Sequence, residues 1–335
     1  MNWSEYWPIP EPWTLRPQSG GINNQTHLVD TPAGAYFLRI YRPDAALTRV
    51  QYELDVLHAL QAEPLPFGVP SPVRTRSGDL LARVPGPDGA ETLATLVPLL
   101  PGAAPDWAPG TRPTAAFGQA LGQLTAALGR VAVRPAPGVL PTYGELHRAS
   151  PAFSDPVTAP YQVDLPADQQ ARLAHLLEKM LEQVPSAYAT LPLQPIHGDY
   201  VPFNLLFEQG QVTAVLDFEF AGLDLRALDL ATGLAACGSN LWGTGAEWPA
   251  IESFVRGYLR YLAITPAEAA ALPFVIRLRR AASFLHMAGR YKLGVAPEWL
   301  LAHGVEGALL MEDWLEVNAG RLVEQLMHWS MEVAR

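Results

Sequence analysis

One segment in the second half of the chain limits both the fold and the chemistry. It reads His-Gly-Asp-Tyr-Val-Pro-Phe-Asn from His197 to Asn204, so that an amide follows the carboxylate of Asp199 by five residues. Pro202 disfavours helical geometry at the residue before it. We therefore expect an irregular loop that presents polar side chains.

A β-hairpin is predicted directly after this loop. Residues 204–208 read as a short strand, Gln209-Gly210 as a turn and residues 211–218 as the return strand. Such a hairpin would fold Asp217 back beside Asn204.

The loop and hairpin together carry a spacing that suits phosphoryl transfer, H-x-D-x-x-x-x-N followed by a later Asp. This chemistry needs positioning and charge neutralisation more than covalent work by the protein. Asp199 is the candidate to orient a hydroxyl and accept its proton. Asn204 and Asp217 offer hard oxygen ligands for Mg²⁺, and His197 is expected to brace the loop by hydrogen bonding.

The segment from Pro195 to Ala231 resembles the aminoglycoside phosphotransferase and choline kinase superfamily, most of all its type II homoserine kinase-like branch. The resemblance implies a bilobal protein-kinase-like fold, with ATP and magnesium as cofactors and a small molecule as phosphoryl acceptor. Homoserine is one acceptor that it suggests. The lobes would be a small antiparallel-sheet N-lobe with one main helix and a larger, mostly helical C-lobe.

The first 100 residues fit the small lobe of such an α+β fold. Strands are expected at 13–17, 26–30, 35–41 and 93–100, with a hairpin of 73–76 and 79–84 around Ser77-Gly78. Apolar residues at helical spacing predict one helix over 45–61. We expect a nucleotide-binding lobe at 1–100, a hinge near 96–102 and a catalytic, acceptor-binding lobe at 101–335.

Nucleotide-binding candidates follow from these positions. Gly20 and Gly21 could let backbone N–H groups approach phosphates, although an ordinary hairpin turn explains them as well. Arg39 lies mid-strand and Glu53 lies inside the next helix. A buried Arg needs a partner, so the two should pair if Arg39 faces inward rather than toward solvent. Residues 96–100 resemble the connection between the lobes in this superfamily, which implies that backbone groups of Leu99 and Leu100 would meet adenine.

The remaining chain reads as mostly helical. Helices are expected at 114–128, 167–184, 248–262, 266–291 and 305–329. Asp229, in Arg-Ala-Leu-Asp-Leu-Ala beyond the hairpin, is interpreted as a helix cap or as a brace for the loop around Asp199.

Acceptor-site candidates are weaker. Glu219 could join the metal shell, meet the acceptor or border the cleft, and it would share a side with Asp217 if the strand continued. The other candidates are Tyr200, Asp224, Arg279, His286 and Arg290. The last three share one helix face, which a solvated surface would explain equally well.

Composition excludes several classes of function. The 335 residues are 49% hydrophobic with a net charge of −10 and no long basic run, which argues against nucleic-acid binding and against adhesion to anionic membranes. Neither a secretory signal nor a membrane-spanning apolar run is evident, so we expect a cytoplasmic protein. Cys237 is the single cysteine, which rules out an intrachain disulfide.

Two functions compete. An ATP- and magnesium-dependent kinase would phosphorylate a hydroxyl of an amino alcohol, an amino acid such as homoserine, a sugar or an aminoglycoside-like compound. A kinase-like regulatory protein would bind nucleotide without turnover. The presence of Asp199, Asn204 and Asp217 together favours the enzyme, because nucleotide binding alone does not require all three.

Overall fold

Contacts between residues divide the chain into two units. The computed structural model describes residues 2–18, 25–42, 45–85, 91–135 and 141–333. The first unit comprises residues 1–105, 130–139 and 203–221, and the second comprises 106–129, 140–202 and 222–335. The hairpin after the 197–204 loop thus groups with the N-terminal strands. The predicted lobe boundary near 96–102 stays a prediction.

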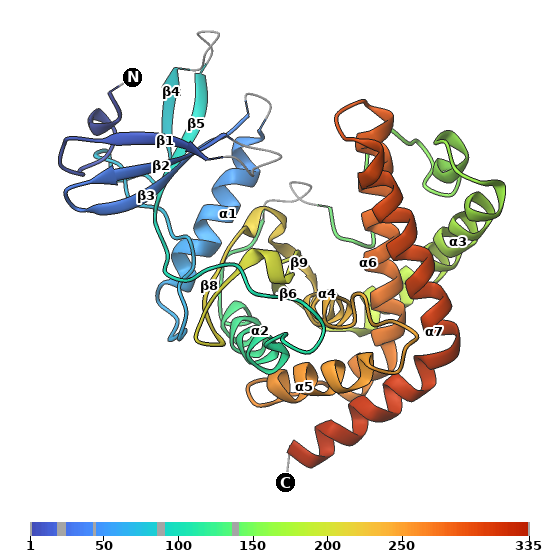
Figure 1. The fold of residues 1–335 in the computed structure, drawn as a ribbon. Helices are drawn as coiled ribbons and strands as arrows, with labels where there is room; N and C mark the ends of the chain where they lie inside the picture. Colours follow the sequence, from blue (N-terminus) through green and yellow to red (C-terminus); the bar gives the residue numbers. More distant parts are fainter. Residues whose placement is uncertain (1, 19–24, 43–44, 86–90, 136–140, 334–335) are drawn as a thin grey trace. The chain divides into compact units, whose positions relative to one another are not determined.

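The first unit contains a five-stranded antiparallel sheet with the order β1-β2-β3-β5-β4 (Figure 1). The strands are β1 Thr14–Gln18, β2 Gln25–Thr31, β3 Gly34–Ile40, β4 Ala82–Pro85 and β5 Glu91–Pro98. Side chains that alternate along them, such as Val29 and Leu38, fill a core around Trp7. The predicted α+β class with a small antiparallel sheet is confirmed.

The hairpin predicted from residues 73–76 and 79–84 is wrong in its first strand. The turn exists, with Gly78 at φ +93°. However, the backbone N–H of Val73 donates to the carbonyl of Leu96, and that of Arg76 donates to Tyr6. Because these donors serve different neighbours, no ladder forms, and β4 pairs with β5 instead.

One α-helix and one hairpin accompany the sheet in the described part of this unit. Helix α1, Leu47–Leu60, buries Val50, Leu54 and Leu57 on one side. The predicted hairpin is present as β7 Leu205–Glu208 and β8 Gln211–Val215, with Gly210 at φ +76° in the turn. Gly210 suits this conformation because it has no Cβ.

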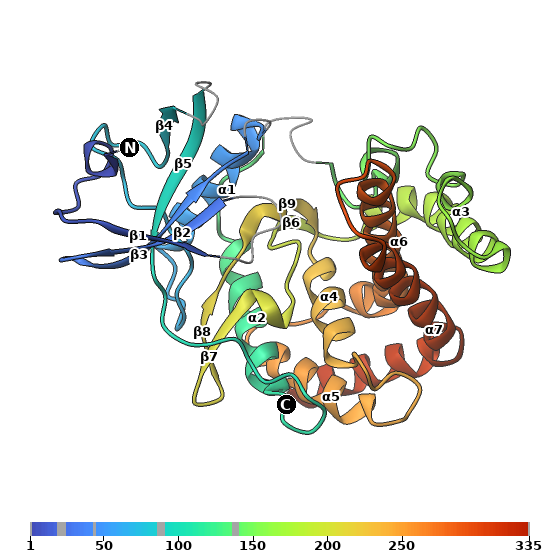
Figure 2. The same ribbon diagram turned by 45° about the horizontal axis from the view of Figure 1, so that its top comes forward.

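The second unit is mostly helical. Its helices are α2 Thr114–Leu128, α3 Ala167–Thr190, α4 Ala227–Cys237, α5 Glu247–Leu259, α6 Pro266–Lys292 and α7 Glu298–Val333. The strands β6 Leu193–Ile196 and β9 Gly222–Leu225 pair antiparallel. Helices α6 and α7 lie side by side in both views (Figures 1 and 2). Thus all five helices predicted for this region exist, and α3 and α7 are longer than expected.

Helices α2 and α5 approach each other closely because glycine stands at the contact. A Cβ at Gly118 would lie 1.9 Å from the carbonyl oxygen of Phe254, and a Cβ at Gly122 would lie 2.5 Å from that of Tyr258. Any larger residue would force the helices apart.

None of the helices in the described ranges has both the length and the apolar character that a membrane span requires.

Candidate active site

The loop that carries Asp199 is fixed by a buried carboxylate of the same unit. Asp229, on α4, is 1% exposed and accepts the backbone N–H groups of His197 and Gly198 at 2.7 and 2.8 Å. Gly198 has φ +82°, which favours glycine. Asp229 is therefore a brace, as predicted. The alternative of a helix cap is wrong, since Arg226 stands at the N-cap and Asp229 lies inside the helix.

His197 completes this bracing from within the loop. Its side chain is fully buried, and its Nδ1 accepts the backbone N–H of Asp199 at 3.2 Å. An accepting Nδ1 places the ring proton on Nε2 when the imidazole is neutral. The structure thus agrees with a hydrogen-bonding role for His197.

The carboxylate of Asp199 meets a guanidinium from α6. Nη2 of Arg279 donates to Oδ1 of Asp199 at 2.8 Å, and the Arg279 side chain is 16% exposed. The same guanidinium stacks over the ring of Tyr143 at 5.0 Å and donates to Ser283. The hydroxyl of Tyr143 donates to the carbonyl of Gly198 at 2.7 Å. Tyr143 therefore holds both the loop and the arginine that touches Asp199.

Asp224 holds the backbone of Tyr143 through a hydrogen bond. It is 3% exposed and accepts the Tyr188 hydroxyl and the Tyr143 backbone N–H, each at 2.6 Å, as well as the N–H of Leu225. Burial raises the pKa of Asp224 to about 6, although these hydrogen bonds oppose the shift. The arrangement favours a positioning role for Asp224, while acceptor contact stays a prediction.

Tyr200 lies deeper than an acceptor residue should. Its ring is fully buried and stacks on Phe117 with 4.7 Å between centroids, and its hydroxyl donates to the carbonyl of Phe117. These contacts are those of a core residue that fixes the loop to α2.

The two other acceptor-site candidates on α6 are His286 and Arg290, which lie beyond Arg279 and are half-buried.

In the first unit, Arg39 pairs with Glu53 as predicted. Nη1 of Arg39 lies 3.0 Å from Oε1 of Glu53, and Nη2 lies 3.6 Å from Oδ1 of Asp217. Burial acts to lower the pKa of Arg39, but the Glu53 carboxylate, Tyr41 and Asp217 outweigh burial and raise it. Arg39 is thus a fixed cation beside two carboxylates. Its contact with nucleotide phosphates stays a prediction.

The predicted hairpin brings its two ends together. The backbone N–H of Leu216 donates to the carbonyl of Asn204 at 2.7 Å, and Leu205 pairs with Val215. Asp217 follows with φ +62° and ψ +67°, a left-handed conformation that is uncommon for Asp and turns the chain out of the strand. Asn204 and Asp217 thus leave the hairpin at the same end.

Glu219 does not continue this strand. It lies in a 3₁₀ turn, Phe218–Phe220, so the expectation that strand alternation puts it on the side of Asp217 fails. Its carbonyl accepts Nη2 of Arg49 from α1 at 2.9 Å, and Arg49 also stacks on Phe220. Burial raises the pKa of Glu53, and the negative charges of Asp217 and Glu219 add to the shift. Its three suggested roles stay open.

The remaining residues predicted to bind nucleotide are Leu99, Leu100, Gly20 and Gly21. The N–H of Leu99 donates to the carbonyl of Ala35 at 2.9 Å, which leaves that donor unavailable for adenine. Leu100 packs over Gly68, where a Cβ would lie 2.9 Å from its side chain. Gly20 and Gly21 lie outside the described residues.

Tyr143, Tyr188, Arg49 and Arg280 were not singled out from the sequence. No motif surrounds them, and only Pro141-Thr-Tyr-Gly144 hints at an ordered turn.

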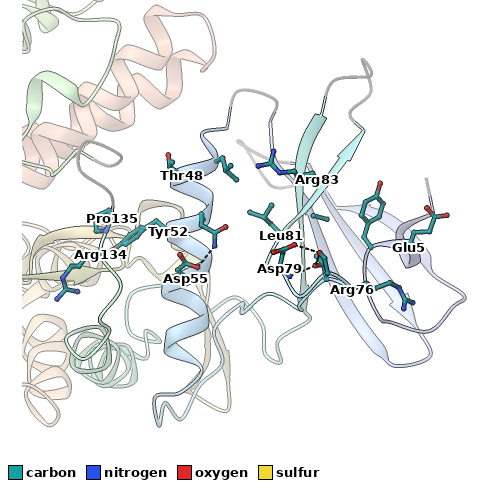
Figure 3. A pocket seen from close by; sticks show the side chains of 16 residues that line it. Glu5, Thr48, Tyr52, Asp55, Arg76, Asp79, Leu81, Arg83, Arg134 and Pro135 are labelled. Atoms are coloured by element: carbon teal, nitrogen blue, oxygen red, sulfur yellow. Dashed lines mark hydrogen bonds between the residues drawn. The ribbon is translucent and has the colours of Figure 1, made fainter.

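A separate cavity lies within the first unit (Figure 3). It measures about 850 Å³ and is walled by α1 and by residues 75–83, with Arg134 and Pro135 at one end. Asp55 and Tyr52 line it, whereas none of the predicted site residues does.

Comparison with known proteins decides the family. The model of a phosphotransferase enzyme family matches residues 14–273. The chain belongs to this phosphotransferase family. The predicted superfamily and the predicted class of enzyme are thereby confirmed.

Individual relatives agree with this family membership. The homoserine kinase of Nitrobacter winogradskyi is 28% identical over 309 residues, which cover 91% of this chain and 80% of the relative. A solved microcompartment-associated aminopropanol kinase superposes with a TM-score of 0.69 and 22% identity, over 94% of this chain and 96% of the other. Amicoumacin kinase, solved with AMP-PNP and Ca²⁺, gives a TM-score of 0.67 and 16% identity, over 92% and 91%. These two structures confirm the kinase-like fold of the phosphotransferase.

Proposed function

We propose that this phosphotransferase is an ATP- and magnesium-dependent kinase of a small hydroxylated molecule. The acceptor would be an amino alcohol, an amino acid such as homoserine, a sugar or an aminoglycoside-like compound. The observation that carries the proposal is the loop of Asp199, which is held by Asp229 through two buried N–H groups. The similarity to homoserine kinases and to an aminopropanol kinase supports it.

In the proposed reaction the acceptor oxygen bonds to the γ-phosphorus of ATP. The bond from that phosphorus to the β–γ bridging oxygen breaks, and ADP leaves. Asp199 orients the hydroxyl and accepts its proton. Arg39, held by Glu53, would pair with the donor phosphates.

Asn204 and Asp217 would hold the magnesium ion. A carboxylate and an amide carbonyl at one end of a hairpin suit Mg²⁺, which binds hard oxygen ligands. Water molecules and the phosphates of the nucleotide would supply its other ligands. In the described part of the chain, no three His, Cys, Asp or Glu side chains form a metal cage, as expected if nucleotide and water complete the shell. When bound, magnesium neutralises charge on the β- and γ-phosphates.

Purified protein with ATP, magnesium and a panel of hydroxylated metabolites tests the proposal. Asp199→Asn should abolish transfer while nucleotide binding persists, and Asp168→Asn, an exposed change on α3, should leave both unchanged. ATP should stabilise the wild type, by about 2.7 kcal/mol at 100 times its Kd. This gain should fall in Asn204→Ala/Asp217→Ala. Full activity of Asp199→Asn would refute the base assignment, and binding without transfer to any acceptor would favour the regulatory alternative.

A further inference from the structure

The cavity of the first unit shares no residue with the predicted nucleotide, metal and acceptor sites. Helix α1 forms one of its walls, and residues 75–83 form the wall that faces it (Figure 3). Its volume of about 850 Å³ falls within the range that is usual for small-molecule sites. All of its lining residues belong to the first unit. The cavity is therefore a candidate ligand site outside the catalytic machinery.

Three carboxylates line this cavity. Asp55, on α1, accepts a hydrogen bond from the neutral amide of Gln51 at 2.8 Å. Asp79, on the facing wall, accepts one from the hydroxyl of Ser77 at 2.7 Å. Glu5 is the third carboxylate. None of the three forms an ion pair within the part of the chain that the structure describes. Their negative charge is thus left for a ligand to neutralise.

The three arginines that line the cavity already have acceptors within the protein. Arg83 forms an ion pair with Glu91 at 2.6 Å. Nε of Arg76 donates to the carbonyl of Ser4 at 3.0 Å. Nη1 of Arg134 donates to two carbonyls of its own segment at 2.9 and 3.0 Å. An anionic ligand would have to compete with these contacts, whereas a cationic ligand meets carboxylates that lack ion pairs.

Tyr52 adds a polar atom that lacks a partner. It lines the cavity from α1 and is 4% exposed, and its hydroxyl has no hydrogen-bond partner among the described residues. Figure 3 shows it at the end of the cavity that holds Arg134 and Pro135. A buried polar group without a partner costs free energy, and a phenolic oxygen accepts hydrogen bonds from an ammonium group. A ligand that reaches this end would therefore gain a contact.

The spacing of the carboxylates favours an extended cation over a metal ion. In the described ranges, no three His, Cys, Asp or Glu side chains come close enough together to hold a metal ion. Glu5, Asp55 and Asp79 therefore do not converge on one point. From this arrangement we infer that the cavity binds an aliphatic diamine or polyamine, whose ammonium groups meet Asp55 and Asp79. Its alkyl chain lies along the apolar side chains of Leu81 and Ala82.

Calorimetric titration without nucleotide tests the inference with three four-carbon compounds that differ in charge. The diamine 1,4-diaminobutane should bind, whereas 1,4-butanediol and succinate should show no binding at the same concentrations. Spermidine, which carries a third ammonium group, should bind about tenfold more tightly than the diamine. Binding of succinate as tight as that of the diamine would overturn the inference, because the arginines would then define the site.

Variants of the two walls locate the bound amine. Asp55→Asn and Asp79→Asn should each raise the Kd of 1,4-diaminobutane by about tenfold or more, because each removes a charge-assisted hydrogen bond. Glu208→Gln removes an equal charge from an exposed position on β7 of the same unit and should leave Kd unchanged. Thermal melting checks the fold of each variant. An unchanged Kd in both Asp variants, or an equal rise in Glu208→Gln, would overturn the inference in favour of non-specific attraction to an acidic protein.

One further variant separates this cavity from the predicted acceptor site. Asp199→Asn should leave the Kd of 1,4-diaminobutane unchanged, because Asp199 does not line the cavity. A tenfold rise in this variant would place the amine at the acceptor site and overturn the inference. Binding is measured without turnover, so the inference stands or falls independently of the proposed kinase function.

Discussion

Nη2 of Arg279 lies 2.8 Å from Oδ1 of Asp199, so the candidate base is held by a cation from α6. The cation is itself held by the face of the Tyr143 ring. Because Tyr143 also donates to the carbonyl of Gly198, the loop and the arginine are fixed by one side chain. The orientation of Asp199 thus depends on three contacts inside the second unit.

Replacing this cation should reduce the rate more than it reduces nucleotide binding. In Arg279→Gln, Asp199 loses a charge-assisted hydrogen bond and its fixed orientation, so we expect kcat to fall by about 10- to 100-fold. Arg279→Lys retains the charge without the planar fork and should fall between the two. Steady-state kinetics with fixed saturating ATP measures the effect. An Arg279→Gln enzyme with wild-type kcat would show that the contact does not orient Asp199.

The glycine contact between α2 and α5 gives a matched pair of stability predictions. Gly118→Ala places a Cβ 1.9 Å from the carbonyl oxygen of Phe254, and overpacking of this kind should lower the free energy of unfolding by about 3 kcal/mol. Gly320→Ala on α7 meets nothing within 4 Å and should raise it by about 0.5–1 kcal/mol. Urea denaturation measures both. Equal effects of the two substitutions would contradict the close helix approach.

The spacing of residues along the chain was enough to predict those parts of the site whose residues lie close together in the sequence. The hairpin between Asn204 and Asp217 follows from two short apolar runs on either side of a Gln-Gly turn, and it is present. The Arg39–Glu53 pair was also predictable, because a buried cation on a strand needs an acid and the next helix offers one.

The rest depends on contacts between distant residues. Tyr143 and Tyr188 meet Asp224 across 81 and 36 residues, and no pattern around them indicates this. Residues 73–76 have the composition of a strand, yet their N–H groups bond to different elements. The chain leaves the strand before Glu219, and Asp217 adopts a left-handed conformation that is uncommon outside glycine, so the sequence pattern did not predict it.

Because of Asp224, the free energy of unfolding should decrease as the pH rises through the mildly acidic range. Its pKa is about 6 in the folded protein and 3.8 ordinarily, so between these values the folded state binds more protons than the unfolded state. Unfolding free energy then decreases with increasing pH, by up to about 3 kcal/mol for this group. Asp224→Asn should remove that part of the slope between pH 4 and 6, measured by denaturation at several pH values. Parallel pH profiles of the two proteins would refute the shift.

Glu53 should control how strongly Arg39 competes with magnesium for Asp217. In the structure Arg39 lies 3.0 Å from Glu53 and 3.6 Å from Asp217, so Glu53→Gln leaves Asp217 as the nearer full charge. A tighter Arg39–Asp217 pair opposes metal binding, and we expect the magnesium concentration for half-maximal rate to rise roughly tenfold, equivalent to about 1.4 kcal/mol. Asp55→Asn, two residues further along α1, removes the same charge from a carboxylate that accepts a hydrogen bond from Gln51. This control variant should leave the magnesium requirement unaltered. If both variants need the same magnesium as the wild type, Arg39 does not compete for Asp217.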